Sequence, residues 1–374
     1  MKGHVSNARN PTLTAAPRSR MRVRIGFIAL VDCAPLLVAH ELGLFVKQGV
    51  DVELSREVGW ATVREKILYR QLDAAHAIAG LTLALRLGLD GIGCPAIAPF
   101  VFNLNGNAIT LSTDLWRRGV RDVKGLQKLI RSTPQHLFTF GIVARTSSHN
   151  FMLRRWLKGA GIDPDHDVRL VVLPPTQMAG SLSAGLIDGY CAGEPWNSVA
   201  VANGIGWCPV TSEDLMPGHP EKVLLTTEDF AMDHPFEMTA IIRALHEACS
   251  FCDRMENRPQ VVEVLHSSGL FHVNKNILRQ SLVGPFDDGT SERRSTENFH
   301  IFHRNNTNEP TREKADWLLT EFSNNGLIPS TMQSAAHDAA AQCWRSDLFH
   351  KAIDTKTAPQ PRRKTKPTPQ PALV

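Results

Sequence analysis

The stretch Arg22-Val-Arg-Ile-Gly-Phe-Ile-Ala-Leu30 is a short, nearly continuous apolar run, and Pro35–Gln48 follows it with apolar residues at helical spacing. The first run predicts a buried strand and the second predicts a helix. A strand followed directly by a helix is the repeating unit of proteins in which helices cover a mostly parallel sheet. These two segments therefore indicate the α/β fold class.

The same alternation continues to about Thr226 and predicts parallel sheets covered by helices. Further strand-like runs are Val50–Leu54, Ala74–Ile78, Ile97–Leu104, Leu137–Val143, Val168–Leu173 and Asp188–Ala192. The helix-like runs between them are Thr62–Gln71, Leu81–Leu87, Val123–Ile130, Asn150–Ala160 and Gln177–Leu186. After Glu228 the pattern is mainly helical, with runs at Pro235–Met255, Pro259–Leu265, Asn276–Leu282 and Thr311–Asn324.

The division of this α/β run predicts two lobes that close like a clamp. We expect the chain to cross between the lobes at Asn105–Ser112 and again at Thr211–Thr226. The first lobe would then hold residues 22–110 and 223–350, and the second lobe residues 111–222. Ligands of α/β folds bind beyond the carboxyl ends of the strands, so we expect the site in the cleft between the lobes.

Composition agrees with a soluble protein of two domains and argues against a basic fold that binds nucleic acid. Of 374 residues, 43% are apolar and 21% are charged, and the net charge is +4. The positive charge lies at the ends, since residues 1–24 carry six Lys and Arg without an acid, and residues 351–374 carry six against one Asp. The body between them is therefore acidic. We expect residues 1–21 and 351–374 to be disordered basic tails.

Two features predict a cytoplasmic location. Residues 1–20 contain no apolar stretch of the kind that a secretion signal requires. The seven cysteines are an odd number scattered through apolar segments, which favours buried thiols over disulfides. Cys249 and Cys252 lie in a helical pattern without a second ligand pair, so we expect neither a metal site nor another cofactor. No 18-residue apolar run without charge is present, and we expect no membrane span.

Two junctions where a strand gives way to a helix carry groups suited to an anion. In Asp188–Asn197 the strand ends at Gly193 and Pro195 suits the first turn of a helix, so backbone N–H groups would point into the cleft. His149 precedes the helix pattern Asn150–Ala160 and is able to donate to an anion, with more force when protonated. An ordinary turn and a helix cap with a solvated histidine are the alternatives at these places.

Three further side chains occupy comparable positions. Trp60 follows a strand and precedes a helix, Asn107 lies at the first expected crossover, and Lys222 lies at the second. Each also has a structural interpretation: core packing for the indole, a turn for the asparagine and a solvated surface charge for the lysine. Their shared position at the edge of the cleft favours a binding role. We find no phosphate loop and no pair of catalytic acids.

These segments together resemble the nitrate/bicarbonate-binding proteins of ABC transport, the NrtA/CmpA family, over about residues 22–327. The marks of the resemblance are Asp32-Cys-Ala-Pro-Leu36, His40-Glu-Leu-Gly-Leu-Phe45, Gly59-Trp60, Leu104-Asn-Gly-Asn107, Ser148-His-Asn150, Gly193-Glu-Pro-Trp-Asn197 and Pro220-Glu-Lys222. The resemblance implies a two-lobed, periplasmic-binding-protein-like clamp of type II with a mainly helical carboxy-terminal part. It implies nitrate or nitrite as the ligand, bound by Trp60, Asn107, His149, the backbone of Gly193 and Lys222.

Two positions bear on which anion the resemblance implies. Asn107 stands where transport members usually have glutamine, which is one methylene longer. The bicarbonate branch is expected to use an acidic residue with calcium where the nitrate binders have a lysine, so Lys222 favours nitrate. Because the neighbouring residue is Glu221, a shift of one position in this comparison would place an acid there instead of the lysine.

The lack of a recognisable secretion signal changes the expected function. The chain is similar to NasS-type sensors, cytoplasmic relatives that hold an ANTAR-domain, RNA-binding antiterminator inactive until nitrate or nitrite arrives. We therefore expect a nitrate/nitrite sensor of nitrate assimilation that releases such a partner on ligand binding and itself contacts neither nucleic acid nor membrane. One alternative is the substrate-binding component of an ABC transporter for nitrate, nitrite or a related oxyanion. Another is an enzyme on the same clamp, for which His149 and Cys191 are the available residues.

Overall fold

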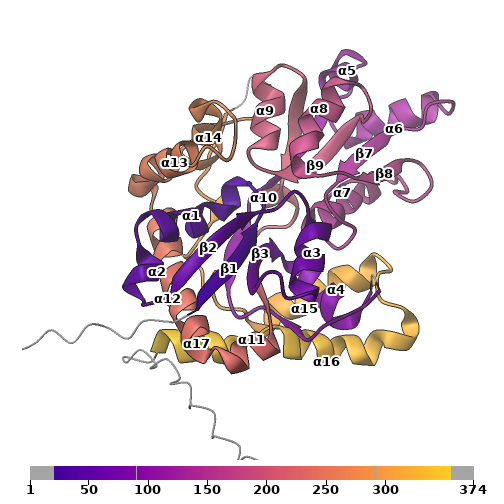
Figure 1. Cartoon of the computed structure of the whole chain (residues 1–374). Coiled ribbons are helices and arrows are strands. Elements are labelled where there is room, and N and C mark those ends of the chain that lie inside the picture. The colour runs from indigo at the N-terminus through magenta and orange to yellow at the C-terminus, as the bar shows by residue number, and fades with distance from the viewer. Residues whose placement is uncertain (1–20, 90, 291–292, 355–374) are drawn as a thin grey trace, which may run out of the picture.

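The computed structural model of the chain describes residues 21–89, 91–290 and 293–354, and it shows two α/β lobes, each built round its own sheet (Figure 1). The basic tails expected at the two ends lie, for residues 1–20 and 355–374, outside the described residues. Within the described part of the chain, no helix is both long enough and apolar enough to cross a membrane.

The first sheet has seven strands and mixed direction. Its strands are β1 (Arg22–Phe27), β2 (Asp51–Arg56), β3 (Ala74–Ile78), β4 (Ala96–Ile97), β5 (Val101–Asn105), β11 (Pro220–Thr227) and β14 (His300–Ile301). Their order is β14-β5-β11-β3-β1-β2, and β4 also pairs with β11. β1 is parallel to β2 and β3, whereas β11 runs antiparallel to both β3 and β5.

The second sheet has five strands and is also mixed. Its strands are β6 (Asn107–Ser112), β7 (Thr139–Ile142), β8 (Arg169–Val172), β9 (Gly189–Gly193) and β10 (Gly206–Thr211). Their order is β10-β6-β9-β7-β8, with β7 parallel to β8 and β9 and with β6 antiparallel to β9 and β10. A short separate hairpin pairs β12 (Phe286–Asp287) with β13 (Arg293–Arg294).

Helices cover both sheets (Figure 1). In the amino-terminal part of the first lobe they are α1 (Ala34–Glu41), α2 (Leu44–Lys47), α3 (Trp60–Leu68) and α4 (Ala79–Leu87), with the short 3₁₀ turn η1 (Val31–Cys33) before α1. In the second lobe they are α5 (Thr113–Arg117), α6 (Val123–Ser132), α7 (Ser148–Gly159), α8 (Met178–Ser183), α9 (Trp196–Ala202) and α10 (Ser212–Leu215), with η2 (Pro175–Gln177) before α8. The carboxy-terminal helices are α11 (Glu228–Asp233), α12 (Pro235–Asp253), α13 (Arg258–Ser267), α14 (Lys275–Leu282), α15 (Arg312–Asn324), α16 (Gln333–Cys343) and α17 (Ser346–Asp354), with η3 (Met255–Asn257) and η4 (Ser330–Met332) among them.

The two segments predicted as crossovers are largely strands. In the segment Asn105–Ser112, the chain turns at Asn105 (φ 62°) and Gly106 (φ 100°) and then forms β6 of the second sheet. Position 106 requires glycine, because its φ is positive and an added Cβ would lie 2.5 Å from the ring of His300. The segment Thr211–Thr226 contains α10 and most of β11, an interior strand of the first sheet. Both strands contain turn-forming or polar residues, so the pattern of apolar residues did not predict them. The chain nevertheless passes between the two sheets within these segments, at Gly106 and between β10 and β11.

Some predictions need correction. The sheets are mixed rather than parallel, because the strands that bring the chain from one lobe to the other run against their neighbours. The helix predicted at Pro35–Gln48 breaks at Gly43, whose φ of 65° ends α1 and starts α2. Residues 351–354 belong to α17 and not to a disordered tail. The helix α16, rich in alanine, was not predicted.

The core of the first lobe fixes the position of η1. The 19-residue helix α12 packs against α1, and its buried face includes Ile241, Leu245, Cys249 and Cys252. None of the seven cysteines forms a disulfide, and all except Cys94 are buried, as the sequence predicts. Because α1 is anchored in this way, the turn that precedes it is held at the end of β1, next to the second lobe.

Candidate functional site

Lys222 and Glu221 are neighbours on β11 whose side chains meet. Adjacent residues of a regular strand point to opposite faces of the sheet, but the register of β11 against β5 shifts on both sides of Lys222. Lys222 Nζ donates to Glu221 Oε1 at 2.6 Å. Both side chains are fully buried.

A second carboxylate reaches the same lysine from the end of β1. Asp32 lies in η1, and its Oδ2 accepts a hydrogen bond from Lys222 Nζ at 2.6 Å. His76 on β3 lies beside it, with Nε2 3.2 Å from the backbone oxygen of Asp32 and 3.5 Å from its Oδ1. The lysine is thus held between two carboxylates.

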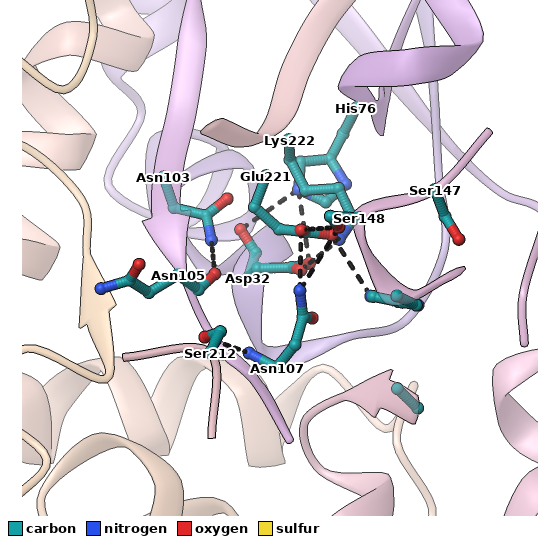
Figure 2. Close-up of polar contacts among 12 residues, drawn as sticks. Asp32, His76, Asn103, Asn105, Asn107, Ser147, Ser148, Ser212, Glu221 and Lys222 are labelled. Atoms are coloured by element: carbon teal, nitrogen blue, oxygen red, sulfur yellow. Dashed lines mark hydrogen bonds and ion pairs between the residues drawn. The ribbon is translucent and has the colours of Figure 1, made fainter. Parts of the chain in front are cut away.

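Glu221 lies on β11 of the first sheet, and Asn107 begins β6 of the second sheet, so the second lobe supplies donors to the carboxylate of Glu221 (Figure 2). Asn107, at the start of β6, donates from Nδ2 to Glu221 Oε2 at 2.7 Å, and the hydroxyl of Ser148, the first residue of α7, donates to the same oxygen. His149 Nε2 lies 3.3 Å from Glu221 Oε1. His219, just before β11, places its Nε2 3.2 Å from Oε2. The carboxylate of Glu221 therefore joins the two lobes.

The charge state of the cluster follows from burial and from these partners. Burial opposes ionisation of Glu221, but the attraction of Lys222 and hydrogen bonds with His149 and His219 hold its pKa well below the usual range. Burial also opposes the charge of Lys222, which Asp32 and Glu221 outweigh, so the pKa of the lysine is raised. Burial lowers the pKa of His149, and the nearby Glu221 only partly offsets this. Near neutral pH the cluster holds a charged lysine, an ionised glutamate and a neutral His149.

Trp60 and Gly193 complete the surroundings of the lysine. Trp60 is the first residue of α3, and the centroid of its ring lies 5.7 Å from Lys222 Nζ. Gly193 ends β9 and is paired with Asn107 across the sheet. A Cβ on Gly193 would lie 3.4 Å from Asn107 Oδ1 and 3.6 Å from Asp32 Oδ2, so the glycine backbone is close to both side chains. The helix α9 follows, preceded by Pro195, close to the start that the sequence predicts.

The structure brings the five predicted site residues together between the lobes. They come from the starts of two helices and from three strands: Trp60 from α3, His149 from α7, Asn107 from β6, Gly193 from β9 and Lys222 from β11. Each of the four side chains is buried. Their role as ligands stays a prediction.

Sequence reasoning missed the acids of this cluster and most of the histidines. Asp32 stood out only as part of the stretch Asp32-Cys-Ala-Pro-Leu36, and Glu221 only as a neighbour of the lysine. Both lie in segments rich in apolar residues, and a buried carboxylate needs a cation or several donors. That requirement was the available signal for pairing Asp32 and Glu221 with Lys222. The same reasoning applies to His76, which lies inside the apolar strand β3.

The cluster offers little for catalysis or for a metal. Cys191, on β9, is buried, and burial raises the pKa of its thiol well above the usual value, so the reactive thiolate is disfavoured. Among the described residues, no group of three or more His, Cys, Asp or Glu side chains is arranged to hold a metal ion.

Two sheets with a polar cluster between them are typical of one class of protein, the two-lobed binding proteins of the periplasmic type II fold. The crystal structure of the periplasmic nitrate-binding protein NrtA from Synechocystis PCC 6803 is similar, with a TM-score of 0.84 and 26% identity over 90% of this chain and 89% of that one. The predicted fold class is therefore confirmed.

The chain belongs to the NMT1-like family, whose sequence profile matches residues 16–266. The nitrate import ATP-binding protein NrtC of Synechocystis sp. is 38% identical over 312 residues, which are 83% of this chain and 47% of that protein. The bicarbonate transport ATP-binding protein CmpC of Synechococcus elongatus is 35% identical over 326 residues, which are 86% of this chain and 48% of that protein. The chain spans about half the length of these curated relatives. The predicted resemblance to nitrate- and bicarbonate-binding proteins is confirmed, whereas the similarity to NasS-type sensors stays a prediction.

Proposed function

We propose that the chain binds a small planar monoanion, nitrate or nitrite, in the site between the lobes. The observation that carries this proposal is the convergence of a charged lysine, an imidazole, a carboxamide and an indole at one buried point. The similarity to the nitrate-binding protein NrtA supports the choice of nitrate. The similarity to a bicarbonate transport protein makes bicarbonate the competing anion to test.

The chemistry of the ligand matches these side chains. Nitrate and nitrite are flat and singly charged, so an indole face is able to cover them while N–H groups meet their oxygens in the plane. Lys222 offsets their charge. Trp60 Nε1 and His149 Nδ1 are buried polar atoms without a hydrogen-bond partner among the described residues. Because buried polar atoms are normally satisfied, these two are available to a ligand, the indole N–H for an oxygen at the edge of the ring and His149 Nδ1 for another. Exclusion of water strengthens each hydrogen bond.

Binding between the lobes would favour the closed arrangement of the clamp. The lobes already meet through the side chains of Asn107 and Glu221, and through the backbone N–H of Val31, which donates to the carbonyl of Glu194 at 2.8 Å. An anion held by residues of both lobes adds to these contacts only when the clamp is closed. A partner that recognises the open form would then be released when the ligand binds.

Calorimetric titration of the purified chain with nitrate, nitrite, bicarbonate and chloride tests the proposal. We expect saturable binding of one nitrate or nitrite per chain, and weaker binding of the other two anions. Trp60→Ala should weaken nitrate binding by about tenfold or more. Trp116→Ala is the matched control. Its indole lies in the second lobe, where Cζ of Arg121 is 3.7 Å from the centroid of the ring. Absence of binding of both nitrate and nitrite by folded protein would reject the proposal.

The resemblance to known binding proteins implies two uses for such binding. One is a cytoplasmic sensor that releases an ANTAR-domain antiterminator when nitrate or nitrite binds, and the other is the substrate-binding component of an ABC transporter. The names of the relatives compared above favour transport. Cell fractionation and co-purification with and without nitrate separate the two. A nitrate-sensitive complex with an ANTAR-domain protein in the cytoplasm supports the sensor, and recovery outside the cytoplasm with a permease supports transport.

A further inference from the structure

The carboxylate of Glu221 occupies the donors of the site. Three of the residues proposed to hold the anion contact it: Asn107 at 2.7 Å, Lys222 at 2.6 Å and His149 at 3.3 Å. Ser148 and His219 contact the same group. A carboxylate is flat, carries one negative charge and presents two oxygens, as nitrite does and as one edge of nitrate does. Glu221 therefore resembles the proposed ligand and uses its partners.

We propose that Glu221 is a built-in competitor for the anion, and that nitrate binds only when this carboxylate releases Asn107, His149 and Lys222 and the site takes up a proton. The proposal rests on the proposed function and deepens it, because it names the residue that sets the affinity of the site and makes that affinity depend on pH.

The charges of the cluster explain why a proton is needed. Lys222 already lies 2.6 Å from the carboxylates of both Asp32 and Glu221. A third anion in this buried site would add like-charge repulsion that water does not screen, since Glu221 is 1% exposed. The charged and titratable groups in contact with Glu221 are Lys222, His149 and His219, and Asp32 lies across the lysine. The side chains of His76, His300 and Cys191 are buried nearby and also interact with the charge of Glu221.

The proton is taken up within the pair formed by Glu221 and His149. Once the anion has replaced the Glu221 carboxylate on its donors, the carboxylate is able to accept the proton. The neutral His149 is the other acceptor, beside the anion. Either way the negative charge of nitrate is balanced by one proton, so the total charge of the site does not change. Binding that takes up a proton strengthens as the pH falls.

A purely structural role for Glu221 makes the opposite prediction. If the carboxylate served only to join the lobes, its loss would weaken the fold and the binding of nitrate together. If it competes with the anion, its loss weakens the ligand-free protein but strengthens the binding of nitrate. The two roles are therefore separated by measuring stability and affinity on the same variant.

Glu221→Gln is the variant, because it keeps the size of the side chain and removes its charge. Glu57→Gln is the matched control, since Glu57 is another buried carboxylate, and its partners are Lys66, 2.8 Å away, and Ser55. Nitrate and nitrite are titrated by calorimetry into the full chain, the variant and the control at pH 6, 7 and 8. Two buffers of different ionisation enthalpy give the number of protons taken up. Thermal unfolding with and without nitrate completes the set.

Three results are expected. Glu221→Gln binds nitrate about tenfold or more tightly than the unmodified chain, with a weaker dependence on pH. The unmodified chain and Glu57→Gln bind more tightly at pH 6 than at pH 8 and take up a proton. Without ligand Glu221→Gln unfolds at a lower temperature than the unmodified chain, and nitrate raises its unfolding temperature by more.

The possible failures are distinguishable. If the unmodified chain binds nitrate but folded Glu221→Gln binds it no more tightly, the competitor role is wrong and the proposed function stands. If Glu221→Gln does not fold, proton uptake by the unmodified chain decides, and binding without uptake overturns the inference. If neither protein binds nitrate or nitrite, the proposed function fails and the inference falls with it.

Discussion

Arg258 and Lys222 are both fully buried cations, and the chain satisfies them in different ways. Arg258, the first residue of α13, donates to three backbone carbonyls, those of Leu282 at 2.9 Å, Thr296 at 3.2 Å and His300 at 2.7 Å. Burial lowers its pKa to about 10, and it remains charged. Lys222 instead lies against two side-chain carboxylates, each 2.6 Å away.

The difference bears on the role proposed for Lys222. Backbone carbonyls are fixed by the fold and cannot be exchanged without unfolding it. A side-chain carboxylate is able to rotate or to take up a proton, so another anion is able to replace it. Arg258 therefore holds fixed carbonyls together, whereas the partners of Lys222 are exchangeable, as the proposed function requires.

The largest effect is expected from Lys222→Met. The carboxylates of Asp32 and Glu221 lose their cation, so the free energy of unfolding should fall by about 3–5 kcal/mol. Nitrate affinity should fall by about 100-fold or more, because the charge that offsets the anion is gone. Urea unfolding and calorimetry measure the two effects. Nitrate affinity that survives in the folded variant would place the anion elsewhere.

Arg258→Met should separate stability from binding. Three carbonyls lose their donor, which should lower the free energy of unfolding by about 3 kcal/mol. None of these carbonyls belongs to the proposed ligand set, so nitrate affinity of the folded variant should stay within about twofold. The same unfolding and calorimetric measurements apply. A parallel loss of affinity would contradict the division between the two cations.

Glu194 extends the comparison to a buried acid. Burial is the main cause that raises its pKa from the ordinary 4.5 to about 7, and its Oε2 accepts from the backbone N–H of Ser198 at 3.2 Å. The unfolded chain loses this proton at lower pH, so the stability it contributes is complete below pH 4.5 and is lost as the pH rises through about 7. The loss amounts to roughly 3 kcal/mol at most.

Glu194→Gln should remove this decline. Urea unfolding at pH 5 and pH 8 should show a smaller difference in the free energy of unfolding for the variant than for the unmodified chain. At pH 8 the variant should be the more stable of the two. An unchanged difference between the two pH values would mean that Glu194 does not titrate in the folded protein.

Asn107→Gln should have the smallest effect. The added methylene pushes the carboxamide toward Glu221, which Asn107 Nδ2 already contacts at 2.7 Å. Nitrate affinity should change by about tenfold or less, with a shift in the ratio of nitrate to nitrite affinity because the fit around the anion changes. Asn203→Ala, on the exposed end of α9, is the control. An equal change in that control would remove the assignment of Asn107 to the site.

The sequence predicted the strand and helix repeats, and through them the approximate place of the site. Trp60 follows β2 of the first sheet and His149 follows β7 of the second, and each stands where a strand gives way to a helix. Ligands of α/β folds bind beyond such strand ends. The strands β6 and β11 were missed because the residues Asn105-Gly106 read as a turn and because Lys222 reads as a surface charge.

The charge network of the site could not be predicted in the same way. Asp32 and Lys222 are 190 residues apart in the chain, and only the packed sheet brings them within 2.6 Å. Glu221 and Lys222 are adjacent, but a regular strand would separate their side chains, and a register shift brings them together. Local patterns carry no information on either contact.

A crystal structure of the chain grown with nitrate tests the central claim most directly. We predict a flat anion against Trp60, within hydrogen-bond distance of Lys222 Nζ, with Glu221 no longer accepting from Asn107. A structure at saturating nitrate in which Glu221 keeps all of its present donors, and in which no anion lies between the lobes, would contradict the account.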